Sequence, residues 1–118
     1  MSDGTVLRAD VFRPDAEGEF LVVMAKGGYG KDVHFRDAFG AQWGVLKRYI
    51  LASIAIGRPA AICRWETVDP ERWVPDGFVV VTVQSRGTGK SPGYFDPYSP
   101  AEPRDYAEAI DWAGIQSW

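Results

Sequence analysis

Three short stretches of this chain have the hydrophobic patterns of strands. In residues 5–13 apolar and polar residues alternate, which predicts a half-buried strand. Residues 20–25 (FLVVMA) and 78–83 (FVVVTV) are continuously apolar instead, as is typical of strands that are buried on both faces. The apolar face of the first strand would carry Leu7, Ala9 and Val11, and its polar face Arg8 and Asp10.

Two other segments repeat their apolar residues at the spacing of a helix. Residues 35–50 predict an amphipathic helix, although Gly40 and Gly44 each cost about 1 kcal/mol relative to alanine there. Residues 104–116 predict a second helix. The apolar positions are Phe35, Phe39, Trp43, Leu46 and Ile50 in the first helix, and Tyr106, Ala109, Ile110 and Ala113 in the second.

The sequence allows two starting points for the second helix. Ser99 and Glu102 fit a capping box, with Pro100 at the first helical position. Pro103 fits that first position equally well, because a proline there loses no helical hydrogen bond.

The order of elements is strand, strand, helix, strand, helix, which predicts an α/β fold: a mostly parallel sheet flanked by helices. Residues 51–76 are irregular, and we expect Trp65 and Trp73 to hold them against the body of the domain. In such sheets the chemistry gathers at the carboxyl ends of the strands. The glycine-rich loops at residues 27–30 and 87–93 both follow apolar strands and should lie there.

The chain has 118 residues, the size of one ordinary domain, and a composition that fits a folded protein. Its net charge of −3 argues against nucleic acids and anionic membranes as partners. No apolar run approaches the ~18 residues that cross a bilayer, and residues 1–5 lack the features of a secretory signal. We therefore expect a cytoplasmic protein that binds neither nucleic acid nor membranes.

Residues 87–91 (GTGKS) partly match a phosphate-binding loop. That motif requires a glycine where this chain has Gln84, and a helix directly afterwards, where this chain has Pro92. We therefore expect no nucleotide cofactor. Glycines 87, 89 and 93 would instead let the backbone turn off the sheet, and Arg86 would brace that turn by donating to nearby carbonyls.

The chain offers no complete catalytic triad and no metal site. None of its six serines lies in the Gly-x-Ser-x-Gly pattern of a nucleophile elbow. His34, beside Phe35, is interpreted as a surface or packing residue, and Cys63 as a small packing residue. One histidine and one cysteine cannot supply a usual ligand set, so we expect no metal and no other cofactor.

Tyr29 is the remaining candidate for chemistry. It lies between Gly28 and Gly30, at the end of the strand predicted over residues 20–25. Backbone of this kind can approach a ligand closely, and the tyrosine hydroxyl could donate to a developing oxyanion. Simple packing of the ring on the loop explains the same residues, and the local sequence favours that explanation.

Four stretches of the chain carry a family resemblance, and together they span nearly all of it in the family's order. They are residues 3–7 with 9–14, residues 28–31 (GYGK), residues 76–81 with 85–93, and residues 105–106 with 110–113 and 116–118. They resemble the N-terminal part of the catalytic domain of the X-prolyl dipeptidyl-peptidase and cocaine-esterase-like (CocE/NonD) serine hydrolases. The third stretch is the most specific.

The resemblance implies an α/β-hydrolase fold, of which residues 1–118 would be an incomplete domain. Residues 5–13, 20–25 and 78–83 would be its second, third and fourth strands. It also implies that the Tyr29 hydroxyl helps to form the oxyanion hole, because a tyrosine does so at the matching position of the family. Gly28 replaces the family's usual proline, which leaves this loop less rigid.

The resemblance implies an enzyme that cleaves ester or amide bonds, X-prolyl dipeptidyl bonds among them, through an acyl-enzyme. The family's serine nucleophile would follow shortly after Trp118, and its acid and base would lie much further on. We therefore expect residues 1–118 to be inactive alone and to need the remainder of the catalytic domain as a partner. An ester or peptide would be the substrate of the full-length enzyme.

The resemblance also implies that residues 20–25 lie between residues 78–83 and a fifth strand beyond Trp118. Without the fifth strand, residues 20–25 become an open apolar edge, so we expect the isolated chain to self-associate or aggregate. The alternative function is a non-catalytic α/β module that binds a small ligand or a partner through the loop of Tyr29.

Overall fold

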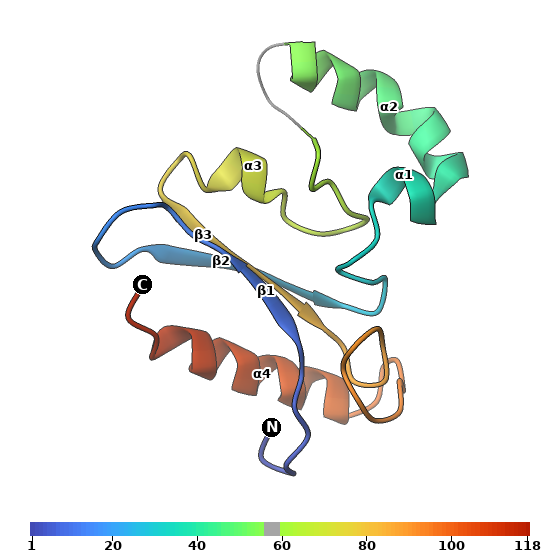
Figure 1. Cartoon of the computed structure of the whole chain (residues 1–118). Helices are drawn as coiled ribbons and strands as arrows, with labels where there is room; N and C mark the ends of the chain where they lie inside the picture. Colours follow the sequence, from blue (N-terminus) through green and yellow to red (C-terminus); the bar gives the residue numbers. More distant parts are fainter. Residues whose placement is uncertain (56–59) are drawn as a thin grey trace.

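The computed structural model describes residues 1–55 and 60–118 and shows a small mixed sheet between helices (Figure 1). The strands are β1 (Ala9–Phe12), β2 (Leu21–Gly27) and β3 (Phe78–Gln84), in the order β1-β3-β2. β3 pairs antiparallel with β1 and parallel with β2. The predicted α/β class is therefore confirmed, with one parallel and one antiparallel pairing among these strands.

The two apolar strands are buried to very different degrees. β3 lies at the centre of the sheet, and Val79, Val80 and Val81 have no exposed surface. In β2 no residue is fully buried, and Leu21 is 75% exposed. The prediction that residues 20–25 are buried on both faces is wrong, because β2 has a neighbour on only one side. Their predicted place at the sheet edge beside β3 is confirmed.

One face of the sheet is covered by α4 (Ala101–Gly114), which lies beneath it in Figure 1. Its buried residues are Asp105, Ala109 and Ala113, four residues apart and therefore on one side of the helix. Ile110, which we expected on that side, is 51% exposed. The helix is instead turned so that Asp105 faces the sheet, where it has an ionic partner.

Neither predicted start of α4 is right in detail. The helix begins after Pro100, which is the N-cap residue and not the first helical residue. The Ser99 hydroxyl finds no partner in the described part of the chain, so no capping box forms. The Glu102 carboxylate binds Lys26 on β2 instead, and Pro103 lies inside the first turn.

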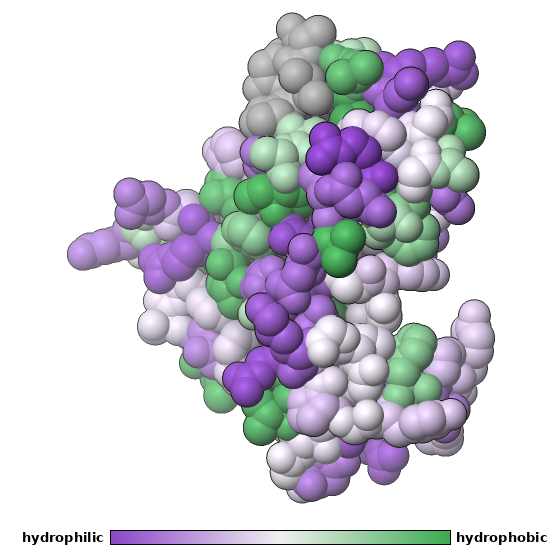
Figure 2. All heavy atoms as spheres, turned by 45° about the vertical axis from the view of Figure 1, so that its right-hand side comes forward, coloured by the Kyte–Doolittle hydropathy of each residue, from purple (hydrophilic) through white to green (hydrophobic). Residues whose placement is uncertain are grey.

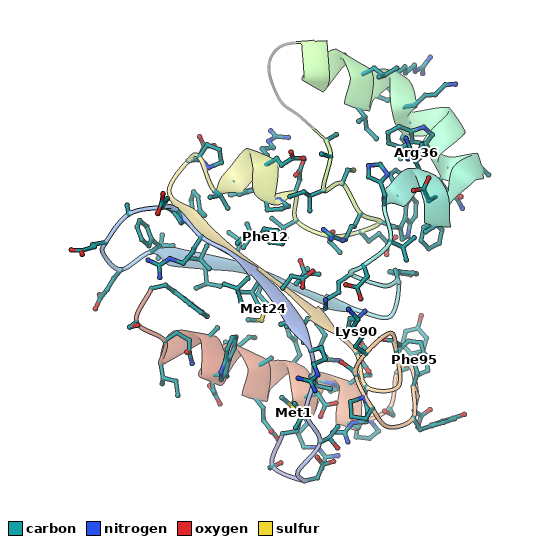
Figure 3. All side chains as sticks on the ribbon, viewed as in Figure 1. Met1, Phe12, Met24, Arg36, Lys90 and Phe95 are labelled. Atoms are coloured by element: carbon teal, nitrogen blue, oxygen red, sulfur yellow. The ribbon has the colours of Figure 1, made fainter. Side chains whose placement is uncertain are left out.

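β1 has the predicted alternation of apolar and polar residues, but the face that carries Asp10 is more buried than the face that carries Val11. Val11 lies on the α4 side of the sheet and Asp10 on the opposite side. α4 packs across β3 and β2, where Figure 3 shows Met24 between the sheet and the helix. Val11 therefore stays 38% exposed beside a groove of about 490 Å³, whereas Asp10 is half-buried by its ion pair with Lys31.

The helix predicted over residues 35–50 is two helices, α1 (Phe35–Ala38) and α2 (Gly40–Ala55). The break is at Phe39, whose backbone leaves the helical region with φ −134°. The Phe39 ring stacks on Trp65 with 5.2 Å between ring centroids, and this contact turns α2 away from the sheet. Figure 2 shows hydrophobic residues at the surface in this region, and four of them on α2 are exposed: Val45, Leu46, Tyr49 and Leu51.

The segment predicted to be irregular, residues 51–76, contains the end of α2 and a short helix, α3 (Pro70–Trp73). Trp73 packs edge-on against Phe78 of β3, as expected of a residue that holds this segment to the sheet. The prediction for residues 56–59 falls outside the described residues. Among the helices that the structure describes, none combines the length and apolar character that crossing a bilayer requires.

Candidate functional site

Two glycine-rich loops follow the parallel strands at the same edge of the sheet (Figure 1). The Tyr29 loop (residues 28–32) follows β2, and the Arg86 loop (residues 85–95) follows β3. The Ser85 amide donates to the Gly27 carbonyl at 3.0 Å, which continues the ladder to the point where the loops separate. Their predicted place at the carboxyl ends of these strands is confirmed.

Tyr29 projects from its loop and remains 51% exposed. Its ring packs edge-on against Phe39, with 5.7 Å between centroids, and Phe39 in turn stacks on Trp65. This aromatic row holds one side of the phenol and leaves the other side accessible. A small cavity of about 80 Å³ adjoins it, between the ends of β2 and β3 and residues 66–67.

Glu66 lies beside the Tyr29 hydroxyl and controls its ionisation. The pKa of Tyr29 is raised, first because the Glu66 carboxylate repels the phenolate, and second because it accepts a hydrogen bond from the hydroxyl. Glu66 has a left-handed backbone (φ 51°), which is uncommon for a residue other than glycine. The phenol therefore stays protonated to a higher pH than an ordinary tyrosine, and it can donate a hydrogen bond at neutral pH as any tyrosine can.

Gly28 lies directly under the ring of Phe95, which Figure 3 labels on the Arg86 loop. A Cβ atom at position 28 would come within 2.6 Å of the Phe95 ring. The two loops thus touch at this point, and the glycine is required by the contact and not by its backbone angles. The aromatic ring limits the freedom that a glycine would otherwise give the Tyr29 loop.

Lys31 forms the charged base of the Tyr29 loop. It is 7% exposed, and its Nζ lies 2.7 Å from Asp10 Oδ1 and 2.9 Å from Asp32 Oδ1. Burial opposes its charge, but the hydrogen bonds to these two carboxylates outweigh that cost and raise the pKa of Lys31. Arg64 adds a second cation 3.8 Å from the other Asp10 oxygen. The loop is thereby tied to β1 across the face of the sheet opposite α4.

The Arg86 loop is built for packing. Gly87, Gly89 and Gly93 all have positive φ, as expected of a sharp turn off the sheet. A Cβ atom at position 87 would lie 2.3 Å from the Phe95 backbone nitrogen. No helix begins until α4, ten residues after Ser91, so the structure contains no phosphate-binding loop here.

Arg86 braces this loop, but not through carbonyls as predicted. Its guanidinium binds Asp105 of α4 with two hydrogen bonds of 2.6 and 2.9 Å. It also donates to Asp3 and Thr5 near the N-terminus. Carboxylates match the forked guanidinium better than single carbonyls do, and the pKa of Arg86 is raised mainly by its bond to Asp105.

The serines of this edge are not accessible nucleophiles. Ser85 is 1% exposed, between Lys26 and Glu102, and it donates to the Glu102 carboxylate at 3.3 Å. Ser91 is 4% exposed; its hydroxyl accepts from the Arg8 amide and donates to the Gln84 carbonyl. Both hydroxyls serve the packing of the loops and strands.

His34 and Cys63 have the structural roles that the sequence predicts. His34 caps α1, because its Nδ1 accepts from the Arg36 amide at 3.0 Å, and its ring packs edge-on against Trp43. Cys63 is a half-buried free thiol whose pKa is raised by burial. Within residues 1–55 and 60–118, no group of three or more metal-ligating side chains comes together.

A comparison with known families decides where this arrangement belongs. The family model described as X-Pro dipeptidyl-peptidase (S15 family) matches residues 3–118. The chain belongs to this family of hydrolases. The family resemblance seen in its sequence motifs is thereby confirmed.

Two solved structures show how this S15-family chain relates to longer proteins. Both are of a CocE/NonD family hydrolase from Staphylococcus aureus, and they match all of this chain with 40% and 39% identity and TM-scores of 0.80 and 0.78. This chain spans only 19% and 20% of their lengths, so its sheet is similar to the N-terminal part of such hydrolases. Among curated proteins, none matches.

Sequence reasoning singled out Tyr29 as a candidate but missed the residues around it. Glu66 belongs to a stretch without periodicity, so no pattern connects it to the phenol. Asp10 carried a weak signal, since a carboxylate on the polar face of a strand can meet a lysine of a neighbouring loop. Phe95 carried none, because its contact with Gly28 joins positions 67 residues apart.

Proposed function

We propose that this chain is the N-terminal segment of a serine hydrolase with an α/β-hydrolase fold, and that Tyr29 donates to the oxyanion. The observation that supports this proposal best is the half-exposed, protonated phenol at the carboxyl edge of the parallel strands. Such an edge is where α/β sheets place their chemistry. The substrates would be esters or amides, X-prolyl dipeptidyl bonds among them.

The proposed reaction proceeds through an acyl-enzyme. A serine from the remainder of the domain attacks the substrate carbonyl, and the carbonyl oxygen becomes an oxyanion. The Tyr29 hydroxyl turns from Glu66 and donates to that oxygen, which stabilises the tetrahedral intermediate more than the substrate. The base of the remaining domain takes the proton of the serine during the attack and returns it to the alcohol or amine as the intermediate expels that group; water then releases the acid from the serine.

We also propose that the free edge of β2 receives the next strand of the full-length hydrolase. The Trp118 carbonyl already accepts a hydrogen bond of 3.2 Å from the Phe20 amide, at the start of β2. A chain that continues from this point in the direction of β2 would pair with it in parallel. Alone, the edge should pair with other copies, so we expect self-association. A monodisperse monomer at high concentration, by sedimentation, would contradict this expectation.

The activity is tested in a chimera in which residues 1–118 replace the matching segment of the Staphylococcus aureus hydrolase. We expect a fluorophosphonate probe to label the chimera and not residues 1–118 alone. Tyr29→Phe should lower the kcat of the chimera for an ester by about 10²- to 10³-fold, the usual effect of losing one oxyanion donor.

Tyr49→Phe, on the outer surface of α2, is the matched control and should retain full activity. Stoichiometric labelling of residues 1–118 alone would show that the nucleophile lies within them and would refute the proposal. An unchanged kcat in Tyr29→Phe would show that the Tyr29 hydroxyl does not stabilise the oxyanion.

A further inference from the structure

The segment that carries Tyr29 is held by hydrogen bonds at its two ends, and between them Gly28 and the Tyr29 ring pack against Phe95 and Phe39. Before it, the Gly27 carbonyl is held by the Ser85 amide. After it, the Lys31 side chain is held by Asp10. Within the described part of the chain, residues 28–30 make no backbone hydrogen bond that would hold the tyrosine in place. The position and direction of the phenol therefore depend on these two ends together with the ring contacts to Phe39 and Phe95.

The attachment at Lys31 is the only one of the two that uses a side chain, and its geometry is specific. The ammonium group lies between carboxylates of β1 and of its own loop, 2.7 and 2.9 Å away. Asp32 continues the contact, since its second oxygen lies 3.5 Å from the side-chain nitrogen of Gln84, the last residue of β3. The loop is thus connected to β1 and to β3 through Lys31 and the residue after it.

The burial of the lysine makes this attachment stiff, although its partners Asp10 and Asp32 are 27% and 40% exposed. Lys31 has almost no access to water, and a buried ammonium group is stable only while carboxylate partners stay within hydrogen-bond distance. A displacement of the loop relative to β1 by about 1 Å would break the bond to Asp10. Exposed ion pairs do not constrain a backbone in this way, because water replaces either partner at little cost.

We propose that Lys31 is a positioning residue for the proposed oxyanion donor. Its ion pair with Asp10 fixes the backbone of residues 30 and 31. Because these residues follow Tyr29 directly, the ion pair keeps the Tyr29 hydroxyl where it can donate to the oxyanion. This inference rests on the proposed function of Tyr29. It adds that the charge at position 31 acts on the transition state through the phenol and makes no contact with the substrate.

A double-mutant cycle in the chimera tests this inference. Lys31→Met keeps most of the side-chain volume and removes the charge; we expect it to lower kcat roughly 10- to 100-fold, as misplacement of a catalytic group by about 1 Å does, with KM changed little. In the Tyr29→Phe background the same substitution should lower kcat less than about twofold, since no hydroxyl remains to be positioned. Lys47→Met, at an exposed lysine of α2, is the charge-matched control and should have no effect.

The outcomes separate this inference from the proposed function. An equal loss in both backgrounds, or a change in KM alone, would mean that Lys31 acts on folding or binding, and would overturn the inference. If Tyr29→Phe itself has a normal kcat, the proposed role of Tyr29 is refuted, and the inference about Lys31 with it. Should Lys31→Met not fold, Asp10→Asn weakens the same ion pair while Asp32 still neutralises the lysine, and the same non-additivity is expected of it.

Discussion

The Tyr29 loop and the Arg86 loop begin as neighbours and are both rich in glycine, yet they are held on opposite faces of the sheet. In the Arg86 loop the guanidinium binds Asp105 of α4, while Lys90 and Tyr94 stay exposed. In the Tyr29 loop the buried Lys31 binds Asp10 of β1, and the aromatic ring stays half-exposed. Glycine content alone therefore does not show how a loop is held; the partner of its cationic side chain does.

The largest expected effect concerns the brace of the Arg86 loop. Asp105→Ala removes two hydrogen bonds of the Arg86 guanidinium and leaves it with Asp3 and Thr5, so we expect a larger loss of unfolding free energy than for any other variant of this series. Urea unfolding of dilute chain, followed by tryptophan fluorescence, measures the loss. Asp111→Ala on the exposed side of α4 is the control and should change stability by less than about 0.5 kcal/mol.

The next effect concerns Gly87, at the turn of the same loop. An alanine there would meet the backbone of residues 94 and 95 and would have to adopt φ +72°, so Gly87→Ala should cost about 2–4 kcal/mol. The same unfolding experiment applies. Neither obstacle can be relieved by moving one side chain. A stability equal to that of the unsubstituted chain would therefore show that the backbone does not require a glycine at position 87.

A smaller effect is expected at Gly28, in the Tyr29 loop. Its φ is not positive, and the only close contact of an added Cβ is with the Phe95 ring, which is 37% exposed and can move aside. Gly28→Ala should therefore cost about 1 kcal/mol. In the double variant with Phe95→Ala the Gly28→Ala substitution should cost nothing further. A full penalty there would mean that the backbone, and not the ring, requires the glycine.

The smallest effect is a shift in the ionisation of Tyr29. Since its pKa is raised in the folded chain, the unfolded chain loses this proton first, and the contribution of the group to stability is lost as pH rises above about 10. The difference in ultraviolet absorbance between the chain and its Tyr29→Phe variant reports the titration. Glu66→Gln should bring the pKa of Tyr29 back toward its ordinary value. An unchanged titration in this variant would show that Glu66 is not the cause of the raised pKa.

The existence of the strands and their order along the chain were predictable because they depend on local pattern, whereas their order in the sheet was implied by the family resemblance. The continuous apolar runs of β2 and β3 are typical of parallel strands in an α/β sheet, and both form. Burial was not predictable from the same runs: residues 20–25 and 78–83 have nearly the same hydrophobicity, and only their places at the edge and the centre of the sheet distinguish them.

Helix boundaries were less predictable, because distant contacts decide them. The apolar spacing of residues 35–50 is continuous through Phe39, but the stacking of this ring on Trp65 interrupts the helix. At α4, Glu102 could cap the helix or pair with Lys26, and the buried lysine has the stronger demand for a partner. In both cases a residue remote in sequence outweighs a local preference.

The sequence by itself determined the α/β class, the family, and Tyr29 as the candidate for chemistry, since these follow from hydrophobic period and from short motifs. Only the tertiary structure decided what surrounds that tyrosine: Glu66 at its hydroxyl, Phe95 over Gly28, and Asp10 on Lys31. Each of these contacts joins segments that are far apart along the chain. Hydrogen bonds and ion pairs act over a few ångströms of space, and no periodicity along the chain records which distant residues will come within that distance.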